Sequence, residues 1–381
     1  MATTTPTLPS TYKALVATEY GQMPTLTTLP MPTATPGSAI VQILATPCDK
    51  GSLGFLDARN PEFSNEVPFI PGVSAVGRIV TTGPDATTLR PGKLVLLEPF
   101  VKARDDPDNA QIIKALFAGP TPEAQVLAQP GLWRDGFWAE YVHVALENCV
   151  PLDEKVLLGA AEEGGLGYDV VDIPHLAPLL VAYGGFRSVG LKAGETVLVA
   201  PGTGWYSGAA VEVAAAMGAR VIAVGRNQDT LKRLTEAVPR VQGVQLTGDE
   251  VKDQEVLAKF GPIDVVMDFT PMGTENPLYL RSGIAALATN GRAVLMGFAY
   301  GDLAANYSAL VIKNLTIKGK YMYEREDITG VVKLVESGLL KLGKQAGQQL
   351  LAQYKFEDFE KAIGQSAELG PWGQQVFFCP V

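Results

Sequence analysis

The sequence has few residues of the kinds that hold metals or form disulfides. Its 381 residues include only three cysteines and two histidines. Cys48, Cys149 and Cys379 are far apart, so they offer neither a disulfide framework nor the close spacing of a zinc knuckle. We therefore expect no bound metal and a reduced, cytoplasmic setting.

Excess basic charge and long apolar runs are also lacking. The formal net charge of −9 argues against a surface for nucleic acid. No apolar run approaches the roughly 20 residues that a membrane span needs, and the N-terminus lacks the basic start and apolar centre of a secretory signal. We expect neither a nucleic-acid nor a membrane partner. The length exceeds what one compact core usually holds, which favours two domains.

A glycine-rich turn is the most informative motif that is present. The apolar run Thr196–Ala200 leads into Gly202-Thr203-Gly204, an alanine-rich helical stretch and a second apolar run, Arg220–Val224. Gly202 permits a tight turn, and Gly204 lets a pyrophosphate approach the backbone at the positive end of a helix. Ser207 replaces the third glycine of the fingerprint, but it is small enough for close helix–strand packing. This pattern predicts a dinucleotide-binding unit.

The residues after the second run indicate which dinucleotide is bound. An acidic residue at this point bonds the ribose 2′-hydroxyl of NAD. Here the chain has Gly225-Arg226-Asn227, which leaves space and supplies a planar cation. A guanidinium suits a 2′-phosphate, so we expect NADP(H).

The pattern along the chain changes near Pro174. Before it, the sequence from about Lys13 to Val150 is rich in alternating strands, and an insertion carries one expected helix at Asn109–Phe117. After it, six expected strands alternate with helices and form a doubly wound parallel sheet. These strands are Thr196–Ala200, Arg220–Val224, Gly243–Leu246, Ile263–Phe269, Arg292–Gly297 and Leu315–Gly319, with further helices at Asp327–Leu342 and Phe356–Ile363.

The whole layout resembles the medium-chain dehydrogenase/reductase superfamily, especially its zinc-free quinone and enoyl reductases. The landmarks are Pro71-Gly72 with Gly77, GFWAEYV at 136–142, VAYGGF at 181–186 and the glycine-rich unit. The resemblance implies an α/β fold with a GroES-like irregular β-barrel domain at 1–178, a Rossmann NADP-binding domain at 179–321, and a tail, 322–381, that returns to the first domain. It also implies a homodimer as one assembly to test.

The positions that hold the zinc ligands in metal-dependent relatives test whether this chain could bind a catalytic zinc. The first falls on Asp49, with Cys48 one residue early, the His-Glu pair falls on Val73-Ser74, and the third falls on Ala177. A catalytic zinc needs three converging ligands, which this set does not supply. His143 and His175 are more typical of structural histidines.

Without a metal, activated alkenes are the easiest hydride acceptors, because the developing charge delocalises. Cys48, Asp49 and Lys50 occupy the segment that carries the metal or proton relay in relatives, and Lys50 is a candidate proton donor. Trp205 and Tyr206 are large aromatics inside the cofactor turn, and the Tyr206 hydroxyl is the leading candidate for a chemical role. The resemblance adds Gly297-Phe298 as nicotinamide contacts, and Thr270 ends a strand at the edge where ligands bind.

The sequence therefore predicts an NADPH-dependent, zinc-independent reductase of an activated C=C bond in a small hydrophobic metabolite. Two alternatives remain open. One is reduction of a C=O or C=N bond with the same cofactor, and the other is an NADP-binding protein with redox-neutral or lost catalysis. Aromatics such as Phe55 and Trp138 are candidates either for a pocket wall or for the core.

Overall fold

The computed structural model describes residues 8–56, 65–303, 305–370 and 372–380. The chain divides into two compact units. The first unit comprises Met1–Pro174, Leu350–Leu369 and Gln374–Val381, and the second comprises His175–Gln349 with Gly370–Gly373. The tail therefore contributes to both units.

The expected domain boundaries shift, most of all near the C-terminus. Helix α9 (Arg325–Glu336) packs on α3 (Leu176–Ser188), so residues 322–349 belong to the second unit and not to a returning tail. Arg187 Nε lies 3.3 Å from Asp327 Oδ1, and a Cβ atom on Gly330 would lie 2.6 Å from the Tyr183 hydroxyl oxygen. This close packing moves the boundary from 321 to 349.

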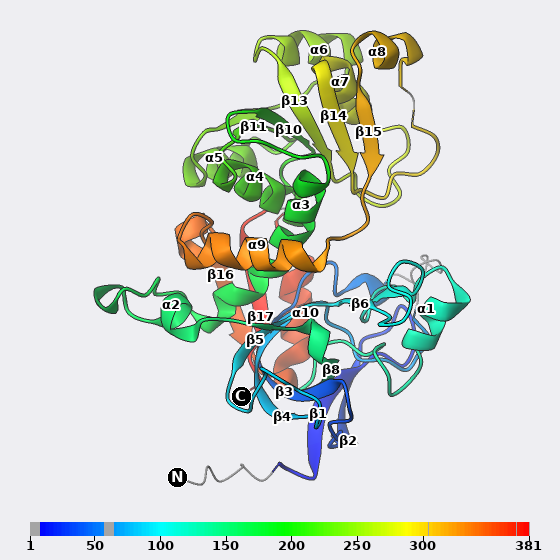
Figure 1. Ribbon diagram of the computed structural model, residues 1–381, viewed down its shortest axis with the longest axis vertical. Helices are drawn as coiled ribbons and strands as arrows, with labels where there is room; N and C mark the ends of the chain where they lie inside the picture. The colour runs from blue at the N-terminus through cyan, green and yellow to red at the C-terminus, as the bar shows by residue number, and fades with distance from the viewer. Residues whose placement is uncertain (1–7, 57–64, 304, 371, 381) are drawn as a thin grey trace. The chain divides into compact units, whose positions relative to one another are not determined.

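The second unit contains a six-stranded, wholly parallel sheet (Figure 1). Its strand order is β12-β11-β10-β13-β14-β15, so the order reverses between β10 and β13. The strands are β10 (Thr196–Ala200), β11 (Arg220–Val224), β12 (Val241–Val244), β13 (Ile263–Asp268), β14 (Leu287–Leu295) and β15 (Thr316–Gly319). The expected doubly wound sheet is confirmed, since buried β-branched runs favour central parallel strands.

Helices join successive strands of this sheet. They are α4 (Trp205–Ala216), α5 (Gln228–Ala237), α6 (Glu250–Ala258), α7 (Leu278–Ala286) and α8 (Tyr307–Ile312). Leu257 of α6 and Ile284 of α7 belong to one buried cluster with Leu198 and Ile222 of the sheet. The burial of these apolar side chains holds the helices on the strands.

The first unit contains a mostly antiparallel, irregular sheet of seven strands, with two further hairpins. The sheet order is β16-β17-β3-β4-β5-β9, β8 also pairs with β3, and the hairpins are β1-β2 and β6-β7. The sheet consists of β3 (Ser38–Pro47), β4 (Ala75–Thr82), β5 (Leu94–Leu97), β8 (Tyr141–Ala145), β9 (Cys149–Pro151), β16 (Gln349–Tyr354) and β17 (Gln374–Phe378); the hairpins consist of β1 (Thr11–Val16), β2 (Thr25–Pro30), β6 (Phe100–Lys102) and β7 (Gln111–Ile113). Short helices α1 (Pro122–Leu127), α2 (Glu154–Leu158) and α10 (Phe359–Ala367) complete it. Phe55 and Trp138 are buried in its core, so neither lines an open pocket.

The expected helix at Asn109–Phe117 is wrong. Ile112 and Ile113 instead form part of β7 and pair with Val101 and Phe100 of β6. Two adjacent β-branched residues favour the strand, and Ala115 then has a φ of 61°, which no α-helix contains. No helix among residues 8–56, 65–303, 305–370 and 372–380 is long and apolar enough to cross a membrane.

Candidate functional site

The glycine-rich turn joins the carboxyl end of β10 to α4. Gly202 N–H donates to the Val224 carbonyl at 2.5 Å, and a Cβ on Gly202 would lie 3.0 Å from that of Ala223. The turn is therefore held against β11. Ser207 Oγ accepts the Gly204 N–H at 2.8 Å, so the serine in the third glycine position caps the start of α4. The Ser207 side chain therefore forms a capping hydrogen bond in addition to permitting close helix–strand packing.

The end of β11 lies beside this turn. A Cβ on Gly225 would lie 2.5 Å from Thr203 Cγ2, so only glycine fits this contact. Arg226 is exposed directly after it. The Asn227 side chain accepts the Thr230 N–H at 3.0 Å and forms the N-cap of α5. The exposed guanidinium is the group in this segment that can meet a phosphate, whereas the Asn227 side chain serves the helix.

Three more expected residues, Thr270, Gly297 and Phe298, meet across the ends of β13 and β14. Phe298 N–H donates to the Thr270 carbonyl at 2.9 Å. A Cβ on Gly297 would lie 2.3 Å from Thr270 N, so the backbones touch there. Ala200 of β10 pairs with Asp268 of β13, which places the glycine-rich turn and these loops on neighbouring strands. This is the carboxyl edge at which open α/β sheets bind ligands.

A buried carboxylate at this edge was not anticipated. Asp268 Oδ1 accepts the N–H of Thr270 at 3.0 Å and its hydroxyl at 2.5 Å. The Tyr279 hydroxyl donates to Thr270 Oγ1 at 3.1 Å, which extends the chain of hydrogen bonds. Burial raises the pKa of Asp268, although the bonds from Thr270 oppose the shift. The sequence feature that could have revealed this carboxylate is an acidic residue at the end of a buried parallel strand.

The two aromatic residues of the turn have different neighbours. The Tyr206 ring stacks on Phe269, with centroids 6.3 Å apart and an interplanar angle of 18°. Tyr206 is about one-third exposed, at 36%. Trp205 is half-buried and meets His175 edge to face, with centroids 5.2 Å apart. Tyr206 therefore remains accessible, while Trp205 is packed against the interior of the second unit.

The segment Cys48-Asp49-Lys50 follows β3 in the first unit. Cys48 is fully buried, and burial raises the pKa of its thiol to about 12. Asp49 Oδ1 accepts the Ser52 N–H at 2.8 Å, and burial raises the pKa of the carboxyl. Lys50 is exposed. Burial thus raises the pKa of both acidic groups of this segment, the Cys48 thiol and the Asp49 carboxyl.

The residues at the zinc-ligand positions do not fit a metal. Val73 and Ala177 carry no ligand atoms, and Asp49 is already engaged by Ser52. His175 Nε2 lies 2.9 Å from the Glu212 carboxylate, and His143 stacks on Trp133. Within the described part of the chain, no group of three or more His, Cys, Asp or Glu side chains is placed to hold a metal ion.

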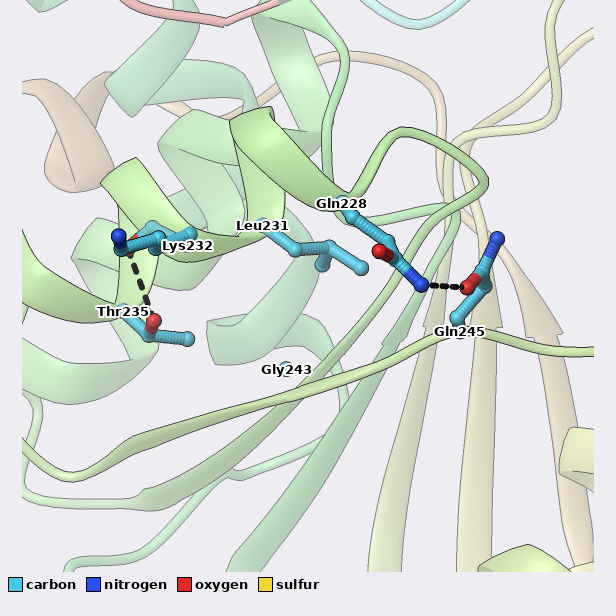
Figure 2. A pocket seen from close by; sticks show the side chains of 6 residues that line it. All are labelled: Gln228, Leu231, Lys232, Thr235, Gly243 and Gln245. Atoms are coloured by element: carbon cyan, nitrogen blue, oxygen red, sulfur yellow. Dashed lines mark hydrogen bonds between the residues drawn. The ribbon is translucent and has the colours of Figure 1, made fainter.

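A polar pocket of about 330 Å³ lies between α5 and β12 (Figure 2). Its lining residues are Gln228, Leu231, Lys232, Thr235, Gly243 and Gln245. Gln228 and Gln245 are joined by a side-chain hydrogen bond across it, and Gln245 Nε2 donates to the Arg226 carbonyl at 3.2 Å. The pocket therefore adjoins the Arg226 end of the edge described above. Its amide and ammonium lining does not suit a hydrophobic substrate.

Two family models match the chain. Residues 35–154 match the alcohol dehydrogenase GroES-like domain, and residues 207–337 match the zinc-binding dehydrogenase model. An acryloyl-coenzyme A reductase of Metallosphaera sedula is 28% identical over 280 residues, covering 72% of this chain and 74% of that protein. A D-xylulose reductase of Saccharomyces cerevisiae is 25% identical over 363 residues, covering 94% and 95% respectively.

Solved structures share the fold. A cobalt- and zinc-bound alcohol dehydrogenase from Pyrobaculum aerophilum has a TM-score of 0.70 at 20% identity, covering 97% of this chain and all of that one. An alcohol dehydrogenase from Escherichia coli with NADH scores 0.74 at 18% identity, covering 97% and 100%. A protein from Sinorhizobium meliloti described as a zinc-binding dehydrogenase, bound to NADP, scores 0.73 at 18% identity, covering 98% and 100%.

The two family models and the parallel-sheet fold indicate an oxidoreductase with a Rossmann-like domain and a GroES-like domain. The two matched regions together span more than half of the 381 residues, in the order that the superfamily requires. These matches, with the relatives and solved structures above, support the medium-chain dehydrogenase/reductase superfamily as the family of this chain.

Proposed function

We propose that this oxidoreductase uses NADPH, without zinc, to reduce an activated C=C bond in a small hydrophobic metabolite. The observation that carries the proposal is the side-chain chemistry at the metal positions, where Val73 and Ala177 supply no ligand. An unactivated carbonyl needs a strong electrophile to accept hydride. An enone, enoyl thioester or quinone accepts it at carbon, since conjugation spreads the negative charge.

The choice of NADPH rests on Gly225 and Arg226. The glycine packs on Thr203, and the exposed arginine directly follows the strand end at which NAD enzymes carry an acid. A guanidinium binds a phosphate through paired, charge-assisted hydrogen bonds. The backbone N–H groups of the glycine-rich turn and the positive end of the α4 dipole would hold the pyrophosphate.

The chain must also deliver a proton. A nicotinamide bound at the glycine-rich turn would supply the hydride, and an activated alkene would take it up at its β-carbon as the π electrons shift toward the carbonyl oxygen. The resulting enolate is completed by a proton at its α-carbon. The Asp49 carboxyl, the Tyr206 hydroxyl and the Lys50 ammonium are the candidate donors, and burial raises the pKa of Asp49. The Cys48 thiol is a weaker candidate because it is fully buried.

Relatives support two readings of the bond that is reduced. The acryloyl-coenzyme A reductases of Metallosphaera sedula and Sulfurisphaera tokodaii are named for a C=C reduction. The D-xylulose reductase of Saccharomyces cerevisiae aligns over more of the chain and is named for a carbonyl substrate. Reduction of C=O or C=N is therefore the second candidate. It ranks behind C=C reduction because Val73 and Ala177 offer no ligand atoms for a metal that would activate a carbonyl.

The test is NADPH consumption with purified full-length protein against enones, enoyl thioesters, quinones, ketones and imines. We expect turnover on the first three classes and unchanged rates after dialysis against a chelator. Substituting Asp49 with Asn should lower kcat by about 10²-fold if this carboxyl delivers the proton. Faster turnover of ketones, or a rate lost on chelation and restored by zinc, would refute the proposal.

A further inference from the structure

A buried carboxylate on α4 joins three separate segments of the second unit. Glu212 is only 3% exposed. Its Oε1 accepts Trp372 Nε1–H at 2.7 Å and Gln348 Nε2–H at 2.9 Å, and its Oε2 lies 2.9 Å from His175 Nε2. Residues distant in sequence thus converge on one side chain of the helix that follows the glycine-rich turn.

The histidine has a definite orientation in this network. His175 is 1% exposed, and its Nδ1 has no hydrogen-bond partner within the described residues. Burying an N–H without an acceptor costs more free energy than burying a nitrogen lone pair. We therefore assign the His175 hydrogen to Nε2 and leave Nδ1 unprotonated. Nε2–H then donates to Glu212, and this bond fixes the plane of the imidazole.

The fixed imidazole contacts the residue that directly follows the glycine-rich turn. Its edge-to-face contact is with Trp205, at 5.2 Å between centroids and 77° between planes. Trp205 is the first residue of α4 and directly follows Gly204. Trp372, the second partner of Glu212, packs on the same first turns of the helix, because a Cβ on Gly208 would lie 2.1 Å from its Cδ1.

We propose that Glu212 and His175 are positioning residues for the nucleotide, acting through Trp205 on the glycine-rich turn. The inference rests on the proposed function in placing the nucleotide at residues 202–207. A turn rich in glycine has a large conformational entropy, and holding it in its bound shape lowers the cost of binding. A buried, hydrogen-bonded carboxylate suits this task, since rotating it away would leave several polar groups unpaired.

The main test replaces His175 with Phe, which keeps a ring against Trp205 but removes the bond to Glu212. Amide hydrogen exchange in residues 202–208 of the nucleotide-free protein should become at least about tenfold faster. KM and Kd for NADPH should rise by about tenfold, while kcat at saturating NADPH changes by less than about twofold. Should the variant fail to fold, Trp205→Leu leaves the buried network whole and should loosen the same turn.

Asp253→Asn is the matched control. Asp253 is a fully buried carboxylate of the same unit that accepts the Thr247 and Gly248 N–H groups at 2.7 and 3.1 Å. Its loss should lower stability yet leave exchange at 202–208 and NADPH affinity unchanged. Equal effects of the control and His175→Phe on the turn, or none from His175→Phe, would overturn the inference. Wild-type protein that binds no NADPH would instead refute the proposed function, and the exchange result would still stand.

Discussion

Individual glycines near the site are required by their neighbours. Gly225 packs against Thr203, and Gly297 lies against the backbone of Thr270, so a methyl group at either position would collide with part of the nucleotide edge. Arg226 directly follows Gly225, is exposed, and carries a positive charge just after the end of β11. Under the proposed function, these single residues would set how closely a nucleotide approaches the backbone and which charge its 2′ position meets.

Substituting Arg226 with Asp should weaken NADPH binding at least about tenfold, since a charge-assisted bond to phosphate is lost and a repulsion replaces it. NADH affinity, which involves no 2′-phosphate, should change by less than about threefold. Titration calorimetry with both nucleotides measures the two effects. Arg325→Asp, on the exposed start of α9, is the control for net charge. Equal losses for both nucleotides would contradict the assignment of Arg226 to the 2′-phosphate.

At the scale of single elements, α4 combines the N-terminus beside the glycine-rich turn with a serine cap and a buried carboxylate. Its first turn presents N–H groups at the cofactor turn, Ser207 caps it, and Glu212 anchors it from within. The Trp372 ring lies against Gly208 on the same helix.

Substituting Gly208 with Ala should lower the free energy of unfolding by about 1–3 kcal/mol, because the new methyl group would overlap Trp372. Gly364→Ala, on α10, is the matched control. Among the described residues, no atom outside its chain neighbours and its own helix backbone lies within 4 Å of a Cβ built there, so alanine should raise stability by up to about 1 kcal/mol. Urea unfolding measures both. A neutral Gly208→Ala would show that the first turn of α4 can shift away from Trp372.

Over the whole molecule, a buried lysine links stability to pH. Lys114 is 1% exposed, its Nζ donates to the Trp133 carbonyl at 3.0 Å, and the ring centroid of Phe137 lies 5.8 Å from Nζ. Burial lowers the pKa of Lys114 from 10.5 to about 8. The folded chain thus releases this proton above about pH 8, whereas the unfolded chain keeps it until about pH 10.5.

Between these values the unfolded state binds more protons, so Lys114 makes the free energy of unfolding rise with pH by up to about 3 kcal/mol. The buried thiols of Cys48 and Cys149, whose pKa values burial raises to about 12, act in the opposite direction above pH 9. The measurement is therefore the difference between wild type and Lys114→Met in urea unfolding from pH 7.5 to 10.5. A difference that does not vary with pH would contradict the buried lysine's role.

Local signals foretold much of the second unit. Buried apolar runs separated by glycines predicted the strands of the parallel sheet, and β10 and β11 begin and end where the sequence suggested, at Thr196–Ala200 and Arg220–Val224. The helix expected at Asn109–Phe117 was wrong, because pairing with β6 decides the conformation of that short segment. Pairing between strands depends on distant residues and leaves only a weak trace in a local pattern.

The sequence by itself determined the parallel sheet, the glycine-rich turn and the absence of ligand atoms at Val73 and Ala177, because each follows from residue type or short-range spacing. Only the tertiary structure decided that Glu212 meets His175 and Trp372. It also decided that residues 322–349 and 370–373 belong to the second unit. The reason is physical: buried hydrogen bonds and close packing join residues far apart in the chain, and no periodicity records which partners meet.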